Sequence, residues 1–147
     1  NQMQSLQNEV IKHKAFPTLT VNNDELMSLS GKSKTLTIQC NEDDYFAKYT
    51  SDRYGFRNPD EIWDKQVDIV VLGDSHVHGD CVNEGKDVVS HIRKISGLTS
   101  INLGWRGTGP FRQLANYREY MLKKPKYLDP FNPTEVLSIT GNGKPYF

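Results

Sequence analysis

Residues 67–79 read VDIVVLGDSHVHG, an apolar run that ends abruptly in glycine, aspartate and serine. The run predicts a buried β-strand over 67–72, and the residues after it predict a turn into a helix. In open α/β sheets the turn after such a strand lies in the crevice above the sheet, where ligands and catalytic groups are found. Ser75 is therefore a candidate nucleophile. An equally strong alternative is that Asp74 and Ser75 only cap the helix, because both residue types are good N-caps.

A second predicted strand, over 99–103, also ends in a distinctive turn. Residues 104–110 read GWRGTGP, with three glycines before a proline that is typical of a helix start. Glycine tolerates positive φ, so this turn can point its N–H groups inward as an oxyanion site, although similar turns also exist only to pack. A hydroxyl and free N–H groups at two adjacent strand ends favour a catalytic arrangement more than either turn alone.

The chain predicts an α/β domain preceded by a polar arm. Residues 1–35 form the arm or linker, with a short amphipathic helix over 2–14, and residues 36–147 form the domain. Strands are expected at 36–38, 67–72, 99–103 and 135–140, and helices at 86–95 and 111–122. Strands that alternate with helices imply a parallel sheet with right-handed crossovers.

With these motifs, residues 34–143 resemble the SGNH/GDSL-like hydrolases, which are serine esterases and sugar acetyl-esterases or transferases. The resemblance is closest to a bacterial branch with an upstream block similar to CNED at 40–43 and SDRYGFRNPD at 51–60. It implies a three-layer α/β/α, flavodoxin-like fold with a parallel sheet, and an active-site serine in the Gly-Asp-Ser turn.

The resemblance also implies individual site residues. Ser75 matches the family's nucleophile, and Gly107 matches the second glycine of its Asn-x-Gly-x-x-Gly stretch, which donates to the oxyanion. Asn142 matches the oxyanion asparagine after the third strand, although Gly143 stands where the family usually has aspartate. The supporting positions implied around the two turns are Gly73, Asp74, which is expected to brace the serine turn by hydrogen bonding, and Gly104.

The family's final Asp-x-x-His element, which supplies the catalytic base, has no counterpart in the sequence. The fold is therefore expected to be incomplete at its C-terminus, and the chain as it stands is expected to be inactive. His76 and His78 are the nearest histidines to Ser75, but neighbours on a strand-to-helix turn seldom reach the hydroxyl with the geometry that proton transfer needs. His13 and His91 are expected to be solvated or packed.

Trp105 and Arg106 lie in the predicted oxyanion turn and are candidate substrate-binding residues. Trp105 offers a stacking platform for a sugar, or else packs without a binding role. A metal site built from His76, His78 and Asp80 is a weaker alternative, because zinc sites need three suitable ligands and a supporting shell. We expect no metal and no cofactor.

The composition is that of a globular domain without an obvious charged or membrane partner. The chain has 147 residues, with 18 basic and 18 acidic side chains, so no nucleic-acid partner is indicated. No segment approaches the roughly 18 consecutive apolar residues of a membrane span. The first residue is asparagine, so we expect the sequence to come from a longer chain, and the lack of a signal peptide does not exclude export.

Two further features keep alternatives open. Cys40 and Cys81 fit either two buried thiols or one disulfide, and a disulfide would imply an oxidising compartment. The family resemblance suits a periplasmic or extracellular location. Asp52, Arg53 and Arg57 predict a solvated face, with the rim of the cleft as the alternative.

Taken together, these residues favour a serine esterase that acts on a carbohydrate ester such as an O-acetyl group through a Ser75 acyl-enzyme. Transfer of the acetyl group to a sugar hydroxyl uses the same residues and stays open. The alternative from another class is a non-catalytic, flavodoxin-like module that binds a ligand or partner and in which Ser75 is only a helix cap.

Overall fold

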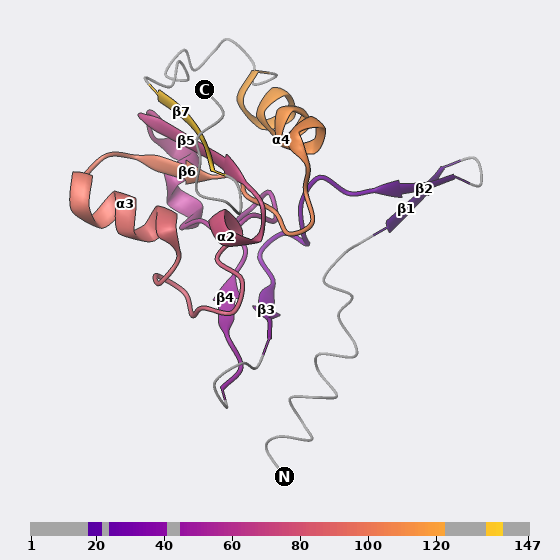
Figure 1. Cartoon of the computed structure of the whole chain (residues 1–147), viewed down its shortest axis with the longest axis horizontal. Coiled ribbons are helices and arrows are strands. Elements are labelled where there is room, and N and C mark those ends of the chain that lie inside the picture. Colours follow the sequence, from indigo (N-terminus) through magenta and orange to yellow (C-terminus); the bar gives the residue numbers. More distant parts are fainter. Residues whose placement is uncertain (1–17, 22–23, 41–44, 123–134, 140–147) are drawn as a thin grey trace.

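The computed structural model describes residues 18–21, 24–40, 45–122 and 135–139 and shows a mixed α/β structure. Its main sheet has the strand order β6-β5-β7 (Figure 1). The central strand β5 spans Ile69–Gly73, and its neighbours are β6 at Ser100–Asn102 and β7 at Glu135–Ile139. Both neighbours run parallel to β5, as predicted for strands that alternate with helices.

Helical segments connect these strands. The short helix α2 (Ser75–His78) follows β5 directly, and α3 (Val88–Ser96) leads to β6. After β6, α4 (Pro110–Tyr117) continues into a π-helical turn, η2 (Arg118–Leu122). Both α2 and α4 contact β5, whereas α3 contacts β6.

Two antiparallel hairpins precede the sheet. Strands β1 (Thr18–Val21) and β2 (Asp24–Met27) form the first, which extends away from the sheet in Figure 1. Strands β3 (Leu36–Ile38) and β4 (Lys48–Thr50) form the second, and the 3-10 helix η1 (Asp60–Asp64) follows. The last residues of the predicted arm contact the rest of the chain, since the Gly31 amide donates to the carbonyl of Gly55 at 3.2 Å.

Most predicted elements in the described ranges are confirmed with shifted ends. The helix predicted from 86 begins at Val88 because the Asp87 carboxylate caps it, accepting from the Ser90 amide at 2.9 Å. The helix predicted over 111–122 is α4 followed by η2. The amphipathic helix predicted over 2–14 lies outside the described residues.

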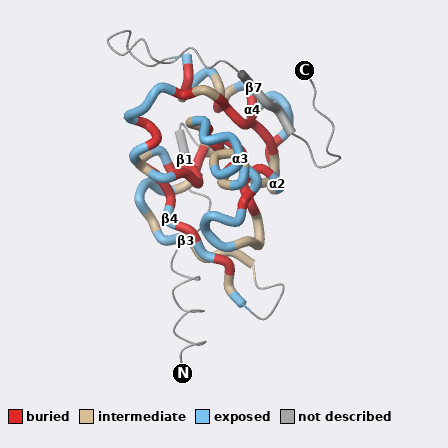
Figure 2. Tube along the Cα trace, turned by 90° about the vertical axis from the view of Figure 1, so that its left-hand side faces the viewer, coloured by how far each residue is buried: buried red, intermediate tan, exposed pale blue. Residues whose placement is uncertain are grey.

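Apolar side chains pack in two clusters around β5. Val70 and Leu72 belong to one cluster, together with residues of η1 and η2, while Ile69 and Val71 belong to the other, which includes residues of α2 and α3. Since successive side chains of a strand point to opposite faces, β5 is buried on both sides. Figure 2 shows the buried trace running through the centre of the molecule.

The upstream block is an internal scaffold centred on Asp52, which is 1% exposed. Its Oδ1 accepts from the amides of Tyr54 and Phe56, both at 2.9 Å. Its Oδ2 accepts from Asn58 Nδ2 and Trp63 Nε1, both at 2.8 Å. Burial raises the pKa of Asp52, and these donors offset that effect only in part.

Asn58 connects this scaffold to the sheet. Its side chain donates to the carbonyl of Asn102 at 3.0 Å and accepts from the Asn102 amide at 2.8 Å, and Arg93 of α3 donates to the same side-chain oxygen at 2.5 Å. The side chain of Asn58 therefore substitutes for a strand at the free edge of β6.

The prediction of a solvated face at Asp52, Arg53 and Arg57 is wrong for two of the three residues. Arg57 is 3% exposed, and its guanidinium donates to the carbonyls of Gly79 and Val82. Only Arg53 is partly exposed, where it pairs with carboxylates of η1. Asp52 and Arg57 instead act as buried hydrogen-bonding groups that hold loops together.

Within the described part of the chain, no helix combines the length and apolar character needed to cross a membrane.

Candidate functional site

The serine turn follows β5 without an intervening loop. Asp74 is the N-cap of α2, and its carboxylate accepts from the His76 amide at 3.0 Å, a hydrogen bond of the kind expected of it in this turn. Ser75 is the first residue of the helix and is partly exposed. Its carbonyl accepts from the amides of Gly79 and Asp80, both at 3.0 Å, which closes the short helix behind it.

The glycine-rich loop after β6 lies directly against this turn. The carbonyl of Gly73 accepts from the Trp105 amide and from the Thr108 hydroxyl, both at 3.1 Å. Between these two donors, Gly107 is exposed and has φ +67°, a conformation that favours glycine. The structure thus brings the two turns singled out in the sequence to one edge of the sheet.

Gly104 permits this close approach. A Cβ added at Gly104 would lie 2.6 Å from the side chain of Val77 in α2. Asn102 reinforces the contact, since its Nδ2 donates to the Val77 carbonyl at 2.7 Å and its Oδ1 accepts from the Gly104 amide at 2.9 Å. The asparagine and the glycine therefore position the loop against α2, which agrees with the supporting role expected of Gly104.

The third strand ends at the same edge. In the β5–β7 register, Ile139 lies opposite Gly73, so β7 ends beside the residue that precedes the serine turn. Asn142, the predicted third oxyanion donor, lies outside the described residues.

Neither histidine near the serine is arranged as its base. The His76 side chain is 69% exposed, and its Nδ1 lies 3.2 Å from the Asp74 carboxylate. His78 is 2% exposed, with Nε2 3.1 Å from the Tyr49 hydroxyl and Nδ1 3.0 Å from Oδ1 of Asp80. Burial lowers the pKa of His78, more strongly than Asp80 raises it. Since a carboxylate only accepts, the neutral tautomer with its proton on Nδ1 suits the Asp80 contact and leaves Nε2 as an acceptor for the Tyr49 hydroxyl.

Trp105 is packed in the interior, and Arg106 pairs with an aspartate. Trp105 is 2% exposed and packs against Phe56 and His78, with ring centroids 6.3 Å and 4.8 Å away. It has no open face for a sugar, which corrects the expectation of a stacking platform. Arg106 pairs with Oδ2 of Asp80 through Nε at 3.0 Å and Nη2 at 2.8 Å.

Asp80 is the residue of this region that the sequence interpretation underrated, having considered it only as a metal ligand. His78 and Asp80 contact each other, but His76 pairs with Asp74 instead, and the described residues contain no group of three that could hold a metal ion. The sequence does contain a signal for the His78–Asp80 pair. It is an aspartate two residues after a histidine, at the end of a short helix.

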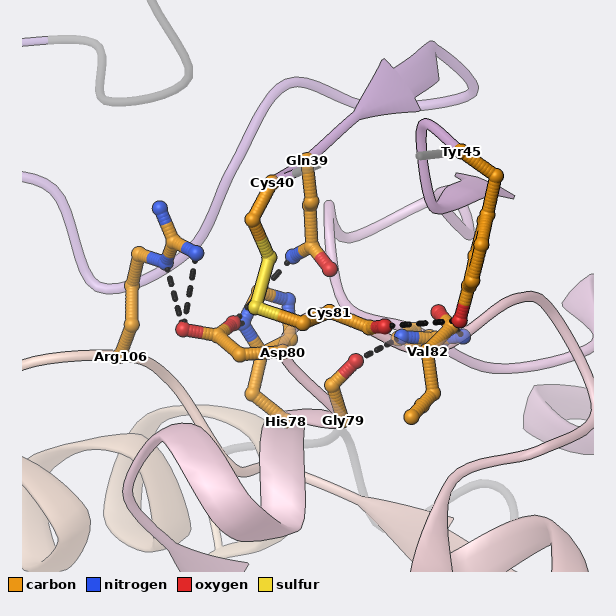
Figure 3. Close-up of a disulfide and its surroundings, with 10 residues drawn as sticks. Gln39, Cys40, Tyr45, His78, Gly79, Asp80, Cys81, Val82 and Arg106 are labelled. Carbon is orange, nitrogen blue, oxygen red and sulfur yellow. Dashed lines mark hydrogen bonds and ion pairs between the residues drawn. A yellow bond between two sulfur atoms is a disulfide. The ribbon is translucent and has the colours of Figure 1, made fainter. Parts of the chain in front are cut away.

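Cys40 and Cys81 form a disulfide with their Cα atoms 5.2 Å apart (Figure 3). This settles the alternative left open by the sequence in favour of the bridge. The disulfide joins the segment after β3 to the loop after α2, next to Asp80. Beside it, Gln39 Nε2 donates to Oδ1 of Asp80 at 3.3 Å.

Comparison with protein-family models, with curated proteins and with solved structures finds no match to this chain.

Proposed function

We propose that this chain is the nucleophile-bearing part of a serine esterase of the SGNH type that acts on a carbohydrate ester. One observation carries the proposal: the Gly73 carbonyl binds both Trp105 and Thr108, so the loop that holds Gly107 lies against the turn that holds Ser75. A partly exposed serine at a helix start beside a glycine with an exposed backbone is the arrangement that acyl transfer requires.

In the proposed mechanism, Ser75 attacks the acyl carbon as a histidine takes the proton of its hydroxyl. The N–H groups of Ser75 and Gly107 donate to the tetrahedral oxyanion, together with the side-chain amide of Asn142. The alcohol leaves, and water or a sugar hydroxyl then accepts the acyl group. The engagement of His78 by Tyr49 and Asp80 argues that a different histidine is the base.

We also propose a fold for the domain and a cellular compartment for the protein. Burial of β5 on both faces is consistent with a three-layer, flavodoxin-like domain, in which an open parallel sheet is covered on each side. The disulfide supports an oxidising compartment, and therefore a periplasmic or extracellular location, because cytosolic thiols are kept reduced.

The test is hydrolysis of p-nitrophenyl acetate by the natural protein in which this sequence occurs. We expect Ser75→Ala to reduce turnover to the uncatalysed background, since removal of a triad nucleophile costs on the order of 10⁶-fold in kcat. Ser33→Ala, which removes an exposed hydroxyl from another turn, is the matched control. A fluorophosphonate reagent should label the peptide that contains Ser75, and mass measurement checks this.

Unchanged turnover in Ser75→Ala, with no labelled serine, contradicts the esterase. That result favours the non-catalytic module, for which the engagement of His78 and the exposure of His76 are the supporting observations.

A further inference from the structure

Asp80 is contacted by side chains from three separate segments of the chain, and Figure 3 shows it between them. Gln39 comes from the end of β3, His78 from α2, and Arg106 from the glycine-rich loop. His78 and Gln39 face Oδ1, while Arg106 binds Oδ2 through two nitrogens. The carboxylate therefore links the serine-bearing helix to the loop that carries Gly107.

The surroundings keep Asp80 charged and in place. Burial raises its pKa, but the contacts with His78 and Arg106 outweigh that effect and lower the pKa of Asp80 overall. The next residue, Cys81, is fixed by the disulfide to Cys40. Asp80 is thus a rigidly held anion at the base of a loop that contains three glycines.

The loop needs such a restraint at one point. Trp105 and Thr108 bind Gly73 on either side, but a Cβ placed on Gly107 would meet no atom within 4 Å. Packing therefore does not fix the peptide that precedes Gly107, and glycine itself has the largest conformational freedom of any residue. The ion pair of Arg106, the adjacent residue, supplies a restraint where packing does not.

A contribution to folding stability does not by itself explain the ion pair between Asp80 and Arg106. The Arg106 side chain is 32% exposed, and ion pairs at that exposure contribute little to stability. Two nitrogens of the guanidinium nevertheless contact the same oxygen, Oδ2 of Asp80, which restricts the direction of the Arg106 side chain and so of the backbone that carries it.

We propose that Asp80 is a positioning residue that, through Arg106, holds the 104–109 loop so that the Gly107 N–H faces the oxyanion formed at Ser75. The inference rests on the proposed esterase function. It assigns Arg106 to the support of the oxyanion site rather than to direct contact with the substrate.

The experiment compares Arg106→Gln with Arg53→Gln in the natural protein. Arg53 is a matched control, because its side chain is also 32% exposed and also pairs with carboxylates, on η1. We expect Arg106→Gln to lower kcat for p-nitrophenyl acetate by about 10-fold or more with KM nearly unchanged, because a displaced oxyanion donor acts only in the transition state. Arg53→Gln should leave kcat unchanged.

Two further variants separate positioning from folding. Arg106→Lys retains a charge for Asp80 and should recover part of the lost kcat, but not all, because lysine has a single nitrogen where arginine contacts Oδ2 with two. Combining Asp80→Asn with Arg106→Gln should cost no more kcat than the larger single effect, since both remove one interaction. Strictly additive losses, or an unchanged kcat in Arg106→Gln, would overturn the proposal.

Amide hydrogen exchange provides a readout that does not depend on activity. We expect exchange across 103–109 to accelerate by about 10-fold in Arg106→Gln and not in Arg53→Gln, as for a segment whose local opening becomes easier. Faster exchange in a protein whose turnover is insensitive to Ser75→Ala supports the restraint and rejects the esterase. Unchanged exchange, in a protein inactivated by Ser75→Ala, rejects the restraint alone.

Discussion

Asp52 and Asp80 are both carboxylates withdrawn from solvent, but the groups that face them differ in charge and in separation along the chain. Asp52 accepts from backbone, amide and indole N–H groups, all supplied by residues 54–63. Asp80 faces an arginine and a histidine, and the residues that contact it lie up to 41 residues away from it in sequence. One carboxylate organises a local scaffold, and the other connects distant loops.

The pKa directions express the same difference. Neutral donors do not fully compensate the burial of Asp52, so its pKa is raised, whereas the charged and histidine partners of Asp80 lower its pKa. A buried carboxylate with only neutral partners is a structural element whose removal affects folding. A carboxylate that fastens a glycine-rich loop is expected to affect function more than folding.

The largest effect that tests the contrast between Asp52 and Asp80 is on the free energy of unfolding. We expect Asp52→Ala to reduce the free energy of unfolding by on the order of 5 kcal/mol, because three buried donors and one partly buried donor lose their acceptor at about 1–3 kcal/mol each and relaxation recovers part of the loss. Urea unfolding measures the change. Asp60→Ala is the control, since Asp60 is one-third exposed and pairs at the surface. Equal losses in the two variants would contradict the distinction between scaffold and surface.

Removing the disulfide should have the next largest effect on the free energy of unfolding. It tests the region around Asp80, because Cys81 is the next residue. The bridge closes a sequence separation of 41 residues, so the double variant Cys40→Ala, Cys81→Ala is expected to lose about 3–4 kcal/mol, chiefly through the entropy of the unfolded chain. Thermal unfolding with and without a reductant checks this. A reductant that lowers the midpoint of the double variant as much as that of the wild type would show that the bridge is not the cause.

A smaller effect concerns the pH dependence of stability, where the two carboxylates act in opposite directions. The pKa values of His78 and Asp80 are lowered on folding, so the unfolded chain binds more protons and stability falls as pH drops below about 6.5 for His78 and below about 4 for Asp80. The raised pKa of Asp52 has the reverse sign: its folded form takes the proton first, so its contribution to stability increases as pH falls.

Urea unfolding between pH 8 and pH 5 tests the contribution of His78 to this pH dependence. We expect the wild type to lose stability as pH falls through this range and His78→Gln to lose less of it, because its buried group no longer titrates. His91→Gln, which removes an exposed imidazole from α3, is the matched variant. A pH dependence of His78→Gln identical to that of the wild type would contradict a neutral, buried His78.

The sequence predicted what depends on neighbours along the chain. The run over 67–72 identified β5, since a strand buried on both faces must be continuously apolar. The capping role of Asp74 followed from its position before a helix, because an N-cap hydrogen bond spans only two residues. The glycine-rich turn after β6 was likewise recognisable, as its conformational demands are local.

Only the tertiary structure decided which distant groups meet. The contacts of Arg57 with Gly79 and Val82, the disulfide, and the contacts of Asp80 with Gln39 and Arg106 all join segments that no local pattern relates. Trp105 could stack or pack according to its sequence, and packing was settled by its neighbours in space. Charged and aromatic side chains are stable either in water or against a suitable partner, so their environment depends on what the fold places beside them.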